Sequence, residues 1–301
     1  MSGQAAAKAS GGRMPADIAG KIRAIGPVID PPATAAVYAP LHEKEPYAGV
    51  KVMRDLKYGP HARQALDVFE PAQAGGPRPV LIYVHGGGYT AGHKRDGSNF
   101  YFDNIMLWAA RNGLVGVNAT YRLAPDHAWP AGAEDVGAIV RWVRANIARY
   151  GGDAARIFLI GHSAGGTHVG SYAVMQQFHG TAGHGLSGLI LLSGVYDLSI
   201  VNPDERYMSY FGSDKSKYAE RSPFAGLLEL QLPLFVAYGE LEPPPLLEQS
   251  ERLAAALTKA KRPAHIVKLA GHSHISITMS INSGDTELSD AMLEFIGSNR
   301  P

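Results

Sequence analysis

The pentapeptide Gly161-His162-Ser163-Ala164-Gly165 constrains the fold of this chain more than any other segment. It follows the apolar run 156–160, which has the pattern of a buried strand, and it precedes an apolar stretch with helical spacing. A serine between a strand and a helix occupies a strained backbone conformation, so its neighbours have to be nearly free of side chains. The amides at the start of the helix favour negative charge near that serine. The segment therefore predicts a strand, a sharp turn that presents Ser163, and a helix.

A second glycine motif, Val84-His85-Gly86-Gly87-Gly88-Tyr89, also follows a strand-like run, at 80–84. Glycine and serine are common in loops, so G-x-S-x-G by itself also fits an ordinary turn. Acyl transfer through a serine forms a tetrahedral oxyanion, which requires hydrogen-bond donors that are already aimed at it. The N–H groups of a glycine loop approach such a charge closely because no side chains obstruct them. Together, the two motifs predict a serine nucleophile beside a backbone oxyanion site.

Composition excludes several kinds of chemistry. The 301 residues contain no cysteine, which rules out disulfides, thiolate nucleophiles and cysteine-bound zinc. A formal net charge of +1 provides no electrostatic reason to expect nucleic acid or an anionic membrane as a partner. Residues 1–12 are rich in Ala, Gly and Ser and lack a continuous apolar segment, so they read as a flexible tail and not as a signal peptide. With no apolar stretch long enough to span a bilayer, we expect a soluble, cytoplasmic protein.

Strand-like and helix-like segments alternate along the rest of the chain, which favours an α/β fold with a mostly parallel central sheet and helices on both faces. We expect one domain over 13–301, without internal repeats, and a small lid built from about 13–45 and 198–230. The expected strands are 50–56, 65–69, 80–84, 114–120, 156–160, 188–193, 232–238 and 264–269, and the main expected helices are 98–112, 133–150, 246–260 and 285–296.

Ser163 is a poor nucleophile unless a base takes its proton, and that base is usually a histidine held by a carboxylate. In a sheet of this kind the serine, the acid and the histidine follow in chain order, each at the C-terminal end of a strand. The side chains at such positions are the acids Asp197, Glu240 and Glu242 and the histidines His272 and His274.

With these residues the chain resembles the α/β-hydrolase superfamily over roughly residues 50–298. One group of motifs is similar to those of the hormone-sensitive-lipase-like esterases, and a second group is similar to those of the kynurenine-formamidase-like hydrolases. The first comprises the HGGGY loop, Tyr121-Arg122-Leu123-Ala124-Pro125, Glu134-Asp135, Gly151-Gly152-Asp153 and Ser163-Ala164-Gly165-Gly166; the second comprises Gly239 to Ser250 and Gly271-x-x-His274-Ile-Ser.

The resemblance implies a catalytic triad of Ser163, Glu242 and His274, with the oxyanion bound by the N–H groups of Gly87, Gly88 and Ala164. His274 has the family's G-x-x-H register, and Glu242 lies seven residues before Gln249-Ser250, as the acid of the second group does. His272 remains an alternative base, and Glu240 and Asp197 remain alternative acids. The chain departs from the family pattern at two positions, because His162 and Glu242 both stand where Asp is usual.

The remaining polar residues of the motifs have structural interpretations. We expect His85 to shape the glycine loop, Arg122 to pair with Asp135 or Glu134, and Asp197 to anchor a loop if it is not the acid. We expect His162 and His168 to pack near the nucleophile, although His162 also adjoins the substrate position. The histidine of the pair 272 and 274 that is not the base should be a solvated loop residue. A metal site at His272-x-His274 lacks a third ligand nearby.

These residues predict a serine hydrolase that uses no cofactor and no metal and that cleaves small carboxylic esters with short acyl chains. No phosphate-binding G-x-x-x-x-G-K-[ST] loop is present, and no G-x-G-x-x-G turn opens a first helix, so neither ATP nor a dinucleotide is suggested. An arylformamidase or amidase is the alternative within enzymes, because the same residues cleave a different leaving group. A ligand-binding protein on a hydrolase scaffold is the alternative outside enzymes. The expected partner is a small-molecule ester, and the expected state is a monomer or homodimer.

Overall fold

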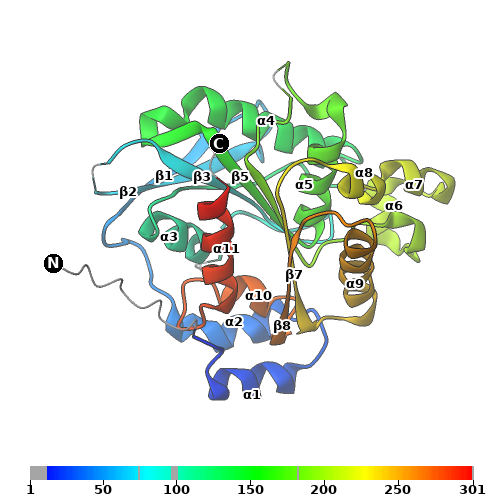
Figure 1. Cartoon of the computed structure of the whole chain (residues 1–301), viewed down its shortest axis with the longest axis horizontal. Helices are drawn as coiled ribbons and strands as arrows, with labels where there is room; N and C mark the ends of the chain where they lie inside the picture. Colours follow the sequence, from blue (N-terminus) through cyan, green and yellow to red (C-terminus); the bar gives the residue numbers. More distant parts are fainter. Residues whose placement is uncertain (1–11, 74, 96–100, 182, 300–301) are drawn as a thin grey trace.

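The computed structural model describes residues 12–73, 75–95, 101–181 and 183–299, and an eight-stranded sheet runs through its centre (Figure 1). The strand order is β1-β2-β4-β3-β5-β6-β7-β8; β2 pairs antiparallel with β1 and β4, and the pairs from β4 through β3 to β8 are parallel. This arrangement confirms the predicted mostly parallel sheet. The strands are β1 (Val50–Lys57), β2 (Ala65–Pro71), β3 (Arg78–Val84), β4 (Val115–Ala119), β5 (Gly152–His162), β6 (Gly188–Leu192), β7 (Leu234–Leu241) and β8 (His265–Ser273).

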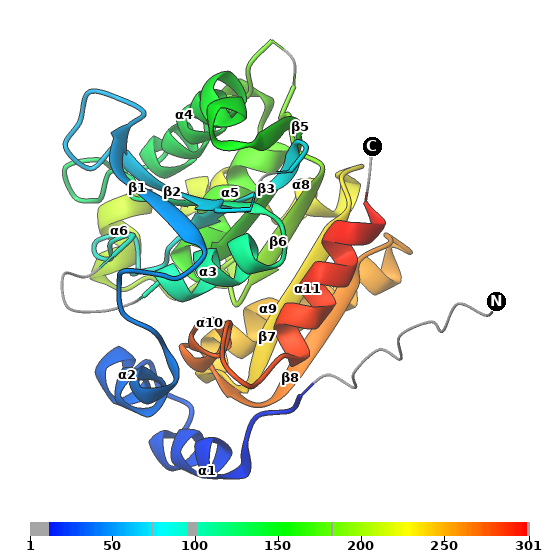
Figure 2. The same ribbon diagram turned by 90° about the vertical axis from the view of Figure 1, so that its left-hand side faces the viewer.

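Helices cover both faces of the sheet, because successive strand residues point to opposite sides and both sides are apolar. In β3, Val80 and Ile82 pack with one set of helices, while Leu81 and Tyr83 pack with the other. Figure 2 shows α11 lying across β7 and β8. The first set contains α4 (Ala131–Asn146), α5 (Ala164–Val174), α8 (Phe224–Glu229) and α9 (Pro244–Lys259), and the second contains α3 (Asp103–Arg111), α10 (Ser276–Met279) and α11 (Glu287–Ser298).

The segments expected to form a lid lie outside these two layers, except for α8 at the end of the second segment, which belongs to the first layer. Helices α1 (Ala16–Ile25) and α2 (Pro31–Tyr38) pack on each other and against β8 and α10, below the sheet in Figure 2. Helices α6 (Glu205–Phe211) and α7 (Tyr218–Arg221) belong to the second segment. The buried Tyr210 and Phe211 of α6 contact the ring of Tyr89, which ends the HGGGY loop. Both segments are therefore anchored beside the C-terminal ends of the strands.

Several boundaries differ from the expected ones. β8 continues to Ser273 instead of ending at 269, so it includes His272. Helix α3 begins at Asp103, and residues 98–100 of the expected helix lie outside the described residues, as do residues 1–11 of the expected tail. None of the helices in the described part of the chain combines the length and the apolarity that crossing a bilayer requires.

Candidate active site

Ser163 stands alone between β5 and α5, at a backbone conformation of φ 55° and ψ −125°. Its N–H donates to the carbonyl of Leu192 at 3.0 Å, which ties the turn to β6. The flanking glycines are sterically required: a Cβ on Gly161 would lie 2.4 Å from the carbonyl oxygen of Gly165, and one on Gly165 would lie 2.2 Å from that of Val84. The structure thus places Ser163 in the sharp turn that the pentapeptide predicts.

The glycine loop after β3 lies directly against this turn. A Cβ on Gly86 would lie 2.9 Å from the Cβ of Ser163. Gly87 has φ +122° and Gly88 has φ +59°, and a Cβ on Gly87 would lie 2.1 Å from a backbone carbonyl oxygen. Only glycine fits the backbone at Gly87 without moving it. Gly87, Gly88 and Ala164 all line the cavity that contains Ser163.

Glu242 and His274 come together from the ends of β7 and β8. The Nδ1 atom of His274 lies 2.7 Å from Oε2 of Glu242, and both side chains are buried. The other oxygen of Glu242, Oε1, accepts hydrogen bonds from the hydroxyl of Ser193 at 2.5 Å and from the N–H of Gly239 at 3.3 Å. The carboxylate is thus satisfied on both oxygens, and the imidazole is oriented by one of them.

The alternative acids are engaged elsewhere. Glu240 is exposed on β7, and its carboxylate accepts from the N–H of Gly271 at 2.7 Å. Asp197 accepts from the N–H and the hydroxyl of Ser199 and from the side chain of Arg252, at 2.7 Å in the last case. These contacts are those of residues that shape loops.

The expectation that the second histidine is a solvated loop residue was wrong. His272 is buried, because β8 extends past it. Its Nε2 lies 3.0 Å from a carboxylate oxygen of Asp285, and its Nδ1 lies 3.2 Å from the hydroxyl of Ser276. His272 therefore links β8 to the segments that carry Ser276 and Asp285.

Two residues in these contacts, Ser193 and Asp285, were missed by sequence reasoning. Ser193 follows β6, and its position next to the acid depends on β6 lying beside β7. The available signal was that Ser193 ends the expected strand 188–193, at the same edge of the sheet as the other candidates. Nothing local to Asp285 indicated its contact with His272, since it precedes a different helix.

Known proteins are similar to this chain in sequence and in fold. A family model described as BD-FAE matches residues 66–189. The esterase LipQ of Mycobacterium tuberculosis is 30% identical over 263 residues, which cover 81% of this chain and 61% of LipQ. A probable isoprenylcysteine α-carbonyl methylesterase of Arabidopsis thaliana, ICMEL2, is 27% identical over 274 residues, covering 82% of this chain and 63% of that protein. The chain thus spans about three fifths of the length of these two relatives.

Among solved structures, esterase B from Lactobacillus rhamnosis superposes with a TM-score of 0.72 at 19% identity, covering 94% of this chain and 96% of that one. An esterase of Pyrobaculum calidifontis superposes with a TM-score of 0.62 at 24% identity, covering 84% and 86%. The chain has the α/β-hydrolase fold. The predicted fold is confirmed, and at these identities the structural matches establish the fold alone.

The cavity that contains both Ser163 and His274 has a volume of about 820 Å³. One wall comes from the first lid segment, through Ile29 and Pro31, and another comes from the second. Most of the remaining lining is apolar or aromatic. Further lining residues are Tyr89, Tyr101, Phe102, Val195, Asn202, Asp204, Arg206, Tyr207, Leu246, Ile275 and Met279.

The other polar residues of the motifs pack around the site and support its loops. Nδ1 of His85 lies 2.6 Å from the carbonyl oxygen of Gly86, and the His85 ring stacks on Tyr121 at a centroid distance of 4.4 Å. Burial lowers the pKa of His85 and of His168 to about 3, so both rings are neutral at pH 7. Arg122 binds Asp135 through its backbone N–H and its guanidinium. These contacts match the structural interpretation of the motifs.

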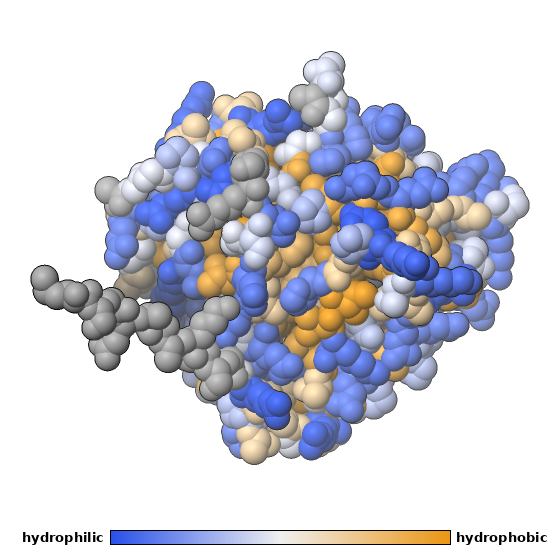
Figure 3. All heavy atoms as spheres, viewed as in Figure 1, coloured by the Kyte–Doolittle hydropathy of each residue, from blue (hydrophilic) through white to orange (hydrophobic). Residues whose placement is uncertain are grey.

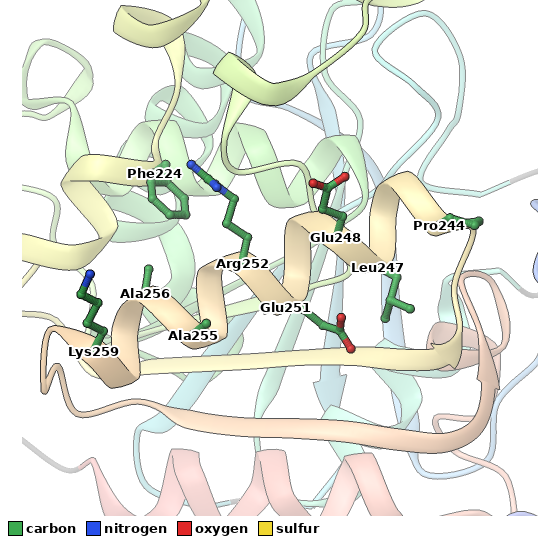
Figure 4. Close-up of a pocket in the computed structure, with 9 residues that line it drawn as sticks. All are labelled: Phe224, Pro244, Leu247, Glu248, Glu251, Arg252, Ala255, Ala256 and Lys259. Carbon is green, nitrogen blue, oxygen red and sulfur yellow. The ribbon is translucent and has the colours of Figure 1, made fainter.

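A second hollow, about 700 Å³ in volume, lies along α9, where apolar residues reach the surface between α8 and α9 (Figures 3 and 4). The guanidinium of Arg252 lies 5.4 Å from the ring centroid of Phe224 across it. Its lining contains neither serine nor histidine, so it offers no nucleophile with a base. Within the described ranges, no group of three or more His, Cys, Asp or Glu side chains is arranged to hold a metal ion.

Proposed function

We propose that this α/β-hydrolase is a carboxylic ester hydrolase that works through an acyl-enzyme on Ser163. The observation that carries the proposal is the convergence of three elements at one cavity: the strained turn at Ser163, the glycine loop against it, and His274 held by Glu242. The names of the two sequence relatives, an esterase and a methylesterase, support the same reaction class.

In the first half-reaction, the hydroxyl oxygen of Ser163 attacks the ester carbonyl carbon and its proton passes to Nε2 of His274. Glu242 keeps the proton of the neutral ring on Nδ1, so that Nε2 is the free acceptor, and its charge stabilises the imidazolium. The carbonyl oxygen becomes an oxyanion, which the N–H groups of Gly87, Gly88 and Ala164 bind. Collapse of the intermediate breaks the bond to the alcohol oxygen, which leaves with the proton of His274.

In the second half-reaction, water attacks the acyl carbon while His274 takes one of its protons. A second oxyanion forms in the same place and collapses, releasing the carboxylic acid as the serine oxygen recovers the proton. Pre-aimed backbone donors contribute to both steps because they gain strength when the charge develops.

We propose uncharged, small-molecule esters with short acyl chains as the substrates. A predominantly apolar cavity with a few convergent polar groups suits such ligands. The formamidase alternative uses the same three side chains and differs only in the leaving group. A ligand-binding role without catalysis is supported less well, because a serine in a strained turn and a histidine bound to a buried carboxylate line or adjoin the same cavity.

A substrate panel tests the proposal: p-nitrophenyl acetate, butyrate and octanoate beside N-formyl-kynurenine, each with the wild type and with Ser163→Ala. We expect turnover of the acetate and butyrate esters and a loss of several orders of magnitude in kcat for the variant. Preferential turnover of N-formyl-kynurenine would favour the formamidase. A folded Ser163→Ala protein with near-native ester turnover would contradict the proposal.

A further inference from the structure

His162, the last residue of β5, lies beside the nucleophile but takes no part in the mechanism above. Its side chain is 3% exposed, and its Nε2 lies 2.8 Å from the backbone carbonyl oxygen of His274. A carbonyl oxygen only accepts hydrogen bonds, so Nε2 carries the proton and donates it. Burial, together with the positive charge that His274 acquires, holds the pKa of His162 well below its ordinary value. His162 is therefore a neutral donor at the pH where the enzyme would work.

The same ring also contacts the ring of His274. The two ring centroids are 4.7 Å apart, and the planes are inclined by 38°. His274 is thus held at three points: Glu242 binds its Nδ1, and His162 binds its backbone carbonyl and supports one face of its imidazole. His162 also lines the cavity that contains Ser163.

On the basis of the proposed function, we propose that His162 is a positioning residue. Its hydrogen bond and its ring contact orient His274, the base, toward Ser163. Its neutrality matters because His274 gains and loses a proton in each turnover. The titratable groups that face His274 are Glu242 and His162. A second carboxylate at position 162, as in the esterases that carry Asp there, would stabilise the protonated base. The histidine therefore leaves Glu242 as the single acid beside His274.

Three variants separate the contributions. His162→Gln retains an N–H that reaches the position of Nε2, and we expect kcat within about threefold of the wild type. His162→Phe retains the ring and removes the donor. Because a displacement of about 1 Å costs up to about 10²-fold, we expect kcat to fall by about 10-fold or more with KM nearly unchanged. His162→Asp adds a charge beside the base, and we expect the acid limb of the kcat/KM profile to move up by about one pH unit.

A residue with only a structural role would leave the acid limb of the kcat/KM profile in place. His168→Gln is the matched control, since it alters a buried histidine of α5 and should leave the limb in place. An unchanged limb in His162→Asp, or equal kcat values for the Phe variant and the wild type, would overturn the positioning role. If His162→Phe does not fold, the acid limb of the kcat/KM profile of His162→Asp alone tests the positioning role. Labelling of wild-type Ser163 by a fluorophosphonate is measured first, and failure there would refute the proposed function itself.

Discussion

Replacing Glu242 by glutamine keeps the size of the side chain, removes its charge and turns one acceptor into a donor. The two oxygens of the native carboxylate have different partners: Oε1 accepts from Ser193 at 2.5 Å and from the N–H of Gly239 at 3.3 Å, and Oε2 faces Nδ1 of His274 at 2.7 Å. The Gly239 N–H is a fixed donor, so the amide oxygen of glutamine is favoured at the Oε1 position. The NH₂ group then faces His274, whose Nδ1 has to accept. The ring proton moves to Nε2, where it blocks transfer from Ser163.

The expected loss combines the wrong tautomer with the missing charge beside the imidazolium. Changes of this type cost up to about 10⁴-fold in kcat, which corresponds to about 5 kcal/mol of transition-state stabilisation. We expect KM to change little, because Glu242 does not line the cavity in the described part of the chain. Steady-state kinetics with p-nitrophenyl butyrate measures both constants, and thermal unfolding verifies that the variant folds.

Two matched variants serve as controls for this prediction. Glu240→Gln changes an exposed carboxylate that accepts from the Gly271 N–H, and Asp197→Asn changes a loop anchor that binds Arg252. Each should retain kcat within about tenfold, because neither side chain reaches His274. The reasoning would be refuted if Glu242→Gln stayed within tenfold of the wild type, or if Asp197→Asn were the crippling change.

Two further predictions concern the loop and the buried histidines. Gly87→Ala should lower kcat by about 10²-fold or more, because the added Cβ would displace the loop. Gly88→Ala should lower kcat less, because the atom nearest to its Cβ belongs to the flexible side chain of Arg206, at 3.2 Å. If both variants changed only KM, the loop would be assigned to substrate binding. His85 and His168, whose pKa values are lowered to about 3 by burial, take up protons on unfolding below their ordinary pKa of about 6.5. From these two histidines alone, the free energy of unfolding should fall by about 3 kcal/mol per pH unit between pH 6 and 4, and His162, whose pKa is also lowered by burial, adds to this slope. Denaturant titrations at pH 6, 5 and 4 measure the slope, and a flat stability would contradict it.

The nucleophile turn and the glycine loop were predictable because their requirements are local. At Gly161 and Gly165 any side chain would collide with a backbone carbonyl, so glycine at both positions indicates a sharp turn. The parallel sheet was also predictable from the sequence, since its strands are continuous apolar runs such as 80–84. The clash at Gly161 lies within the pentapeptide and each apolar run is continuous in the chain, whereas the clash at Gly165 comes from Val84 of β3.

The contacts around the base were not predictable in the same way. The contact of His272 with Asp285 joins β8 to the segment before α11, and the support of Glu242 by Ser193 depends on which strands are neighbours. Likewise, the hydrogen bond from His162 to the His274 carbonyl joins the end of β5 to the residue after β8, and these two strands are not adjacent in the sheet. The pattern of residues along the sequence does not show which of such distant segments lie side by side, or in what register.

The mass of the intact protein after reaction with a fluorophosphonate tests the central claim most directly. If Ser163 is activated by His274, the wild type gains one phosphonyl group, peptide mapping places it on Ser163, and Glu242→Gln reacts far more slowly. Ser163→Ala should gain no mass under the same conditions. Labelling at another serine, or a wild type that stays unmodified while folded, would contradict the account.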